Sequence, residues 1–183
     1  MIASLTGTVS ALTPLGVVLT VGGVGLAVQT TPVTRSRLRT GDQAALATSL
    51  VVREDSLTLY GFETSDERDI FELLQTASGI GPKVAQAVLT VHQPDGVRRA
   101  IGSEDLTALC LVPGIGRKGA QRMVLELKDK IAGTAGHVTA GAPGAAAWRD
   151  LLGDALTGLG WSQAQADEVV VRLAAEHAAA TES

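Results

Sequence analysis

A nine-residue pattern that occurs twice restricts the middle of this chain to a pair of helical hairpins. The segment ASGIGPKVA (77–85) returns 35 residues later as VPGIGRKGA (112–120), with Gly-Ile-Gly, the Lys and the final Ala in matching places. Each copy lies between segments in which apolar residues recur at helical spacing. A Gly-apolar-Gly turn lets the chain reverse tightly, and the Ile fills the gap between the two helices. The repeat therefore predicts two helical hairpins of the same kind, each made of two helices joined by a tight turn.

The second glycine of each turn is expected to open a site for phosphate. It leaves backbone N–H groups bare at the start of the next helix, and a phosphate can approach closely because no Cβ intervenes. Basic side chains nearby add electrostatic attraction. One copy alone is explained equally well as a joint between packed helices, but two copies favour binding. The predicted phosphate-binding residues are Gly79, Ile80, Gly81, Lys83, Gly114, Ile115, Gly116, Arg117, Lys118 and Arg122.

Five short segments before the hairpins predict a small β-barrel. They alternate or run apolar, and glycines or charged turns separate them. Closure into a coiled barrel of the OB kind would hide most of the strand edges, and an SH3-like barrel is the alternative. The segments are 5–10, 16–21, 24–30, 43–53 and 56–62.

The stretch VVREDSLTLY (51–60) places two carboxylates at the tip of a predicted hairpin. Glu54 and Asp55 stand where tight turns favour Asn-Gly or Asp-Gly. Taken alone, a charged pair at a loop tip is interpreted most simply as a solvated polar turn.

The whole chain is expected to be a multi-domain α+β protein with four parts. Residues 1–63 form the five-stranded OB-fold barrel, and residues 64–131 form an all-α domain with the two hairpins. Residues 132–147, rich in Gly, Ala and Thr, predict a flexible linker. Residues 148–183 predict a small helical domain. Its first helix carries an apolar stripe that comprises Leu152, Leu156 and Leu159.

Composition indicates a globular protein with aliphatic cores, because 45% of the residues are hydrophobic and only 3% are aromatic. The net charge of −4 does not argue against nucleic-acid binding, because residues 134–183 hold two basic and six acidic side chains and so carry the whole excess. Met1 leads into a strand-like run rather than a signal peptide or membrane span, which predicts a cytoplasmic protein. Cys110, the single cysteine, is expected as a small core residue.

No catalytic residue, metal site or cofactor is predicted. The three His lack metal-ligand spacing. Neither hairpin turn follows a strand, and no Gly-Lys-Ser/Thr is present, so the sequence indicates neither a dinucleotide site nor a Walker A loop. The chain is therefore not expected to hydrolyse ATP itself.

With these features in place, the sequence resembles the RuvA family, the Holliday-junction-binding subunits of bacterial branch-migration complexes. The two turns look like helix-hairpin-helix motifs, and the resemblance covers nearly the full chain. Other segments similar to the family pattern, in family order, are residues 1–2, VGGVG (21–25), VVRED (51–55), LYGF (59–62) and LVPGIGRK (111–118).

The resemblance implies a non-catalytic DNA-binding subunit of an ATP-dependent helicase complex. Glu54 and Asp55 would form an acidic pin at the centre of a tetrameric disc, where four DNA arms converge. Implied partners are four-way junction DNA, the hexameric ATPase RuvB, the resolvase RuvC, and further copies of the chain in a tetramer or octamer. The C-terminal domain would dock RuvB, which uses the ATP. The family's module has a further helix, so the one here is expected to be incomplete.

Two alternatives remain at the level of the sequence. One is a helix-hairpin-helix DNA glycosylase/lyase with Lys118 as a Schiff-base nucleophile, although residues 133–141 offer no catalytic carboxylate. The other is a generic DNA-binding module that uses the same hairpins without selecting junctions.

Overall fold

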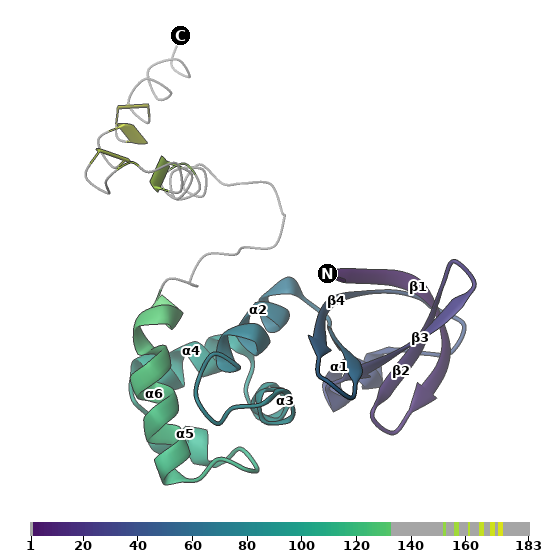
Figure 1. Cartoon of the computed structure of the whole chain (residues 1–183), viewed down its shortest axis with the longest axis horizontal. Helices are drawn as coiled ribbons and strands as arrows, with labels where there is room; N and C mark the ends of the chain where they lie inside the picture. Colours follow the sequence, from purple (N-terminus) through teal and green to yellow (C-terminus); the bar gives the residue numbers. More distant parts are fainter. Residues whose placement is uncertain are drawn as a thin grey trace. The chain divides into compact units, whose positions relative to one another are not determined.

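The computed structural model of the chain describes residues 2–132 continuously. Farther on it describes residues 152, 156, 157, 161, 165, 166, 169, 170, 172 and 173. The chain divides into two compact units, Met1–Thr139 and Ala140–Ser183. Every element with assigned bounds belongs to the first unit (Figure 1). The predicted linker and most of the predicted C-terminal domain lie outside the described residues, so both stay predictions.

The N-terminal part is a closed five-stranded barrel. Its strands follow the order β1-β2-β3-β5-β4 around the barrel, and all neighbours are antiparallel except β3 and β5. This closed, OB-like order confirms the predicted fold class and decides against the SH3-like alternative. The bounds are β1 Ser4–Thr13, β2 Gly16–Val21, β3 Val24–Thr30, β4 Gln43–Val52 and β5 Leu57–Phe62.

The barrel interior follows from alternation along each strand. Val9, Leu19 and Val28 are almost fully buried and belong to one apolar cluster. β1 extends beyond the predicted segment because its pairing with β2 shifts between Val9 and Ala11. A bulge of this kind interrupts the period of two, which is why the sequence pattern stopped at Ser10.

A helix that the sequence analysis missed connects β3 to β4. α1 spans Pro32–Arg37, with Thr31 as its N-cap accepting a hydrogen bond from the Thr34 N–H at 3.2 Å. Thr followed by Pro is a helix-start signal, but six residues are too few to show helical periodicity.

The helical part begins after the barrel and contains five helices. α2 begins with a reciprocal pair of cap hydrogen bonds: Thr64 accepts from the Glu67 N–H at 3.2 Å, and the Glu67 carboxylate accepts from the Glu63 N–H at 2.9 Å. The bounds are α2 Ser65–Leu74, α3 Pro82–Val91, α4 Pro94–Gly102, α5 Leu106–Cys110 and α6 Arg117–Ala132.

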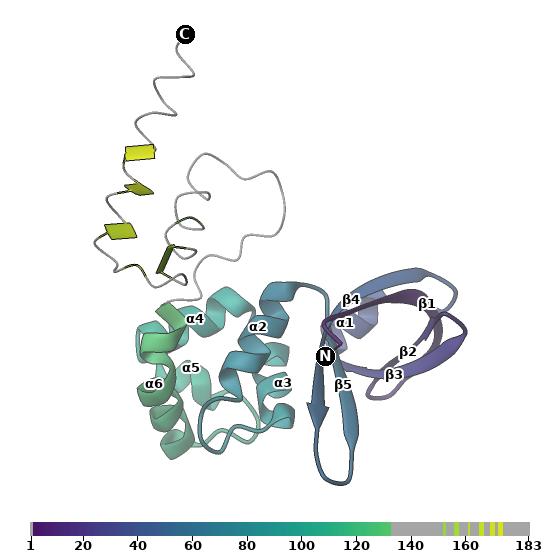
Figure 2. The same cartoon turned by 45° about the horizontal axis from the view of Figure 1, so that its top comes forward.

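The barrel and the helices share apolar contacts. The Phe71 ring of α2 lies 4.9 Å from the Tyr60 ring and 4.8 Å from the Phe62 ring, measured between centroids. Ser49 of β4 also donates a hydrogen bond to the Glu72 carboxylate at 2.8 Å. Figure 2 shows α2 and α3 beside the end of the barrel formed by β4 and β5. The strands therefore form a scaffold that holds the helical part.

The expectation for Cys110 was wrong, because its side chain is exposed. α5 has only five residues, and its buried residue is Leu109. Neighbouring positions on a short helix point about 100° apart, so burial of Leu109 turns Cys110 outward.

Candidate nucleic-acid interface

The first glycine of each hairpin turn adopts a conformation that other residues avoid. Gly79 has a φ of 84° and Gly114 has a φ of 91°. Both angles lie in the left-handed region, where a Cβ is strained. These two glycines let α2 reverse into α3 and α5 reverse into α6, as the repeat predicted.

The isoleucine between the glycines fills the interior of each hairpin. Ile80 is 9% exposed and Ile115 is 6% exposed, and both belong to the helical core. Their side chains therefore anchor the turns, and any contact they offer to a ligand comes from the backbone.

The second glycine of each turn leaves open space rather than filling a tight corner. Gly81 is the N-cap of α3 with a φ of −88°, which any residue adopts, and no side chain caps this helix. A Cβ added at Gly81 or at Gly116 would meet no atom within 4 Å. Neither packing nor backbone angle requires glycine there, so what glycine provides is an unobstructed helix N-terminus.

The two turns are held against each other by α6. The Arg122 Nη1 atom lies 3.9 Å from the position a Cβ would take on Gly79, and Val84 Cγ2 lies 4.0 Å from that of Gly114. The Glu126 carboxylate accepts a hydrogen bond from the Ser78 N–H at 2.7 Å. The two predicted phosphate sites are thus fixed relative to each other.

The Glu126 contact was missed by the sequence analysis. Its signal is the placement of Arg122, Glu126 and Lys130 at intervals of four, which puts them on one face of α6. Lys130 Nζ donates to the Thr76 hydroxyl at 3.2 Å, so this face meets the first turn at more than one point.

The predicted basic contacts are exposed and carry no competing charge. Within residues 2–132, the basic partners in ion pairs are Arg37, Arg68, Arg98 and Lys128. None of the predicted phosphate contacts is among them, and all are solvent-exposed, which leaves their charges available to a ligand. These exposed contacts are Lys83, Arg117, Lys118 and Arg122.

The acidic pair lies at the tip of the hairpin between β4 and β5. Val52 pairs with Leu57 as the last strand pair, and the Arg53 N–H donates to the Ser56 carbonyl at 2.8 Å. Glu54 and Asp55 are exposed between them. Neither has a positive φ, so the turn is not of the kind that demands Asn-Gly. The hairpin extends past the barrel body (Figure 2).

Of the predicted C-terminal contacts, Leu152 and Leu156 are half-buried in the second unit, and Leu159 lies outside the described residues. The Trp161 N–H donates to the Leu156 carbonyl at 3.1 Å. This contact is local and leaves the predicted docking role untested.

The described residues contain neither a candidate metal site nor a candidate membrane span. No group of three or more His, Cys, Asp or Glu side chains is placed there to hold a metal ion. No helix in the same part of the chain is long and apolar enough to cross a membrane.

A closed barrel followed by two glycine-turn hairpins defines a class of protein built on tandem helix-hairpin-helix motifs. Residues 71–129 match the model described as a SAM-like helix-hairpin-helix tandem, and residues 1–61 match the RuvA N terminal domain. The chain belongs to the RuvA family.

Curated relatives carry the same family name over nearly the whole chain. The chain is 59% identical over 180 residues to a protein of Streptomyces coelicolor, covering 98% of this chain and 90% of that one. It is 58% identical over 179 residues to one of Salinispora tropica, covering 95% and 88% respectively. A third, from Acidothermus cellulolyticus, is 53% identical over 176 residues, with 96% and 88% covered. Each is named Holliday junction branch migration complex subunit RuvA.

Proposed function

We propose that this chain binds four-way DNA junctions through their phosphates and holds them open for branch migration in recombination and repair. The observation that carries the proposal is the pair of open helix N-termini at Gly81 and Gly116, fixed side by side with unpaired cations around them. Contacts of this kind read the DNA backbone and its shape rather than base edges.

The phosphate contacts would combine backbone and side-chain donors. Bare N–H groups at the start of α6, and at the start of α3 apart from Pro82, which has no N–H, would donate to a phosphate, and the helix dipole favours its charge. Lys83 lies in the first turn of α3, and Arg117 and Lys118 lie in the first turn of α6. Each neutralised phosphate releases counterions, so binding should weaken steeply with salt.

The acidic tip would supply the selectivity for a junction. In a tetramer, four copies of Glu54 and Asp55 would meet at the centre, where a carboxylate close to a phosphate is repelled. At 4 Å this repulsion costs about 1 kcal/mol in bulk water and about 4 kcal/mol at a protein surface. An open junction can place its central hole over the tips, whereas a continuous duplex cannot avoid them.

We also propose that this chain works with protein partners. The relatives' name describes a subunit of a branch migration complex, and we extend this to RuvB as the ATPase, RuvC as a further partner and a tetramer or octamer of this chain. Residues 148–183, with Leu152, Leu156 and Leu159, would dock RuvB, and residues 132–147 would tether them to the DNA-binding domains 1–63 and 64–131. The chain itself would use no ATP, cofactor or metal and would act on the nucleoid in the cytoplasm.

The lyase alternative loses its support, because the chain belongs to the RuvA family and its relatives are named as branch migration complex subunits. Lys118 is instead proposed as a phosphate contact. The other alternative is a generic DNA-binding module. Equal affinity for junction and linear duplex would favour it.

The double variant Gly81→Ala with Gly116→Ala tests the proposed function. Both new methyl groups would point into open space, so folding should lose no more than about 1 kcal/mol per helix cap. Binding of a four-way junction should weaken at least about tenfold, because the methyl groups hold phosphate away from the N–H donors. Fluorescence anisotropy with a labelled junction measures this.

Gly102→Ala is the matched control. Gly102 is the last residue of α4 and belongs to neither turn, and a Cβ there also meets nothing within 4 Å. It should bind like the wild type. Unchanged junction affinity in the double variant would rule out the hairpin turns as the DNA contacts.

A further inference from the structure

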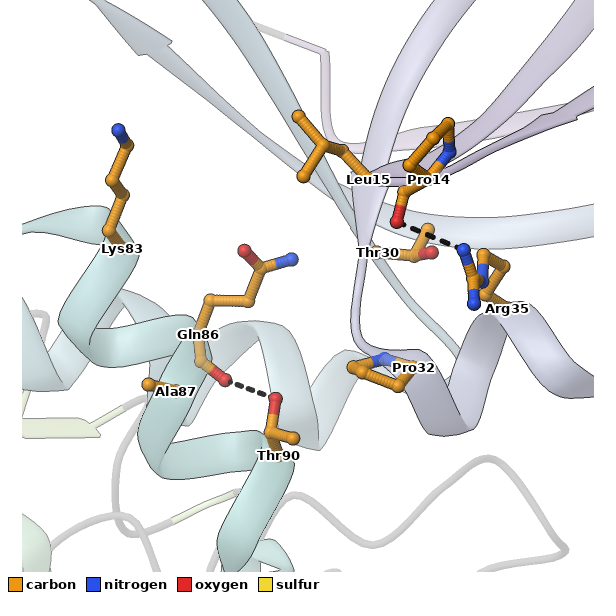
Figure 3. Close-up of a pocket in the computed structure, with 9 residues that line it drawn as sticks. All are labelled: Pro14, Leu15, Thr30, Pro32, Arg35, Lys83, Gln86, Ala87 and Thr90. Atoms are coloured by element: carbon orange, nitrogen blue, oxygen red, sulfur yellow. Dashed lines mark hydrogen bonds between the residues drawn. The ribbon is translucent and has the colours of Figure 1, made fainter. Parts of the chain in front are cut away.

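A cleft of about 270 Å³ lies between the barrel and α3, and of its lining residues only Lys83 has a role in the functions above. Lys83, Gln86 and Thr90 line it from α3, and Thr30 and Arg35 face them from the end of β3 and from α1 (Figure 3). The volume far exceeds the roughly 30 Å³ of one water molecule. Two of the nine lining residues are cationic and none is acidic, which favours an anionic ligand.

Thr30 brings an unsatisfied buried hydroxyl to this cleft. Thr30 is only 5% exposed, and among the described residues its Oγ1 atom has no hydrogen-bond partner. The Thr30 N–H donates to the Leu15 carbonyl at 3.1 Å, which fixes the backbone that carries the hydroxyl. A buried hydroxyl without a partner destabilises the fold. Because Oγ1 is closed to solvent, a ligand oxygen in the cleft would satisfy it once the Thr30 side chain turns toward the cleft.

Arg35 is held in position by one nitrogen of its guanidinium. Nη1 donates to the Thr13 carbonyl at 3.0 Å and to the Pro14 carbonyl at 2.9 Å. Within residues 2–132, no carboxylate pairs with Arg35. These two hydrogen bonds orient the planar guanidinium of Arg35. Its remaining N–H donors suit the oxygens of a phosphate.

We infer that this cleft is an additional phosphate site, which binds a phosphodiester of the DNA strand held at the first hairpin. The inference rests on the proposed function, since that hairpin positions the strand. Lys83 belongs both to the first turn of α3 and to the cleft.

The test is junction binding by the full chain at several salt concentrations, for Arg35→Gln and Thr30→Val. Arg35→Gln should weaken binding about tenfold and reduce the slope of log affinity against log salt by about 0.9, the loss of one phosphate contact. Thr30→Val should also weaken binding, yet its thermal midpoint without DNA should rise, because an unpartnered buried hydroxyl is removed.

Two further variants serve as controls. Arg39→Gln removes an exposed charge shortly after α1 that does not line the cleft, and its salt slope should match the wild type. Arg35→Lys keeps the cation but loses the planar fork, so it should keep the slope and lose part of the affinity.

Three results would overturn the cleft assignment. One is a wild-type slope in Arg35→Gln, and another is wild-type affinity in Thr30→Val. The third is a change of oligomeric state in Arg35→Gln, measured by native mass spectrometry, which would mean that a second copy covers the cleft. Lys118→Gln on the second hairpin separates the two hypotheses. If only Lys118→Gln changes the slope, the cleft proposal fails and the proposed function stands; if neither does, both fail.

Discussion

The four glycines of the two hairpin turns have two distinct physical roles. Gly79 and Gly114 are required by their positive φ, and Gly81 and Gly116 are not required by φ or by packing. The first pair therefore maintains the fold, and the second pair keeps a surface open. Conservative substitutions should separate stability from binding at positions only two residues apart.

Gly79→Ala should destabilise the protein by about 1–2 kcal/mol, because alanine is strained at a φ of 84°. Packing adds little, since the nearest atom to the new methyl group is Arg122 Nη1 at 3.9 Å. Urea unfolding followed by circular dichroism measures the change. A stability equal to that of Gly81→Ala would contradict the separation of roles.

At the scale of elements, an ion pair fastens α4 to the start of α2. Arg98 pairs with Asp66 and also reaches Asp95 at 3.0 Å. The Arg98 side chain is only 16% exposed, and the hydrogen bonds that it donates to the Asp66 carboxylate raise the pKa of Arg98 above its usual value. The guanidinium therefore stays charged and holds the middle helix between the two hairpins.

Arg98→Met should lower the free energy of unfolding by about 2–4 kcal/mol, because it leaves the partly buried Asp66 carboxylate without its partner. Arg99→Met is the matched control on the same helix, since Arg99 is exposed and should change stability by less than about 0.5 kcal/mol. Chemical unfolding measures the free energy of unfolding of both variants. Equal values would show that the ion pair does not hold α4 to α2.

Local patterns in the sequence predicted the elements well and their mutual contacts poorly. The strands and the repeated turns follow from alternation and glycine placement, so both were predictable. α1 was too short for a periodic signal, and the outward direction of Cys110 depends on which α5 residue packs inward. The Glu126 bond to Ser78 joins positions 48 residues apart, and the cleft beside Thr30 forms only when the barrel meets α3.

At the scale of the whole molecule, the unit Met1–Thr139 carries two opposite electrostatic features. The hairpin turns present bare N–H groups and unpaired cations, and the β4–β5 tip presents two exposed carboxylates. A chain with only the first feature would bind any duplex by its phosphates. In the proposed function, preference for a junction comes from the second feature, which would lower the affinity for continuous duplex.

The ratio of duplex to junction dissociation constants, measured for the wild type and for Glu54→Gln with Asp55→Asn, tests this most directly. Removing both charges should increase duplex affinity about tenfold and leave junction affinity close to that of the wild type, so the ratio should fall about tenfold. Asp42→Asn removes an exposed acid from a different barrel loop and should leave the ratio unchanged. An unaltered ratio in the double variant would contradict a role for the acidic tip in selecting junctions.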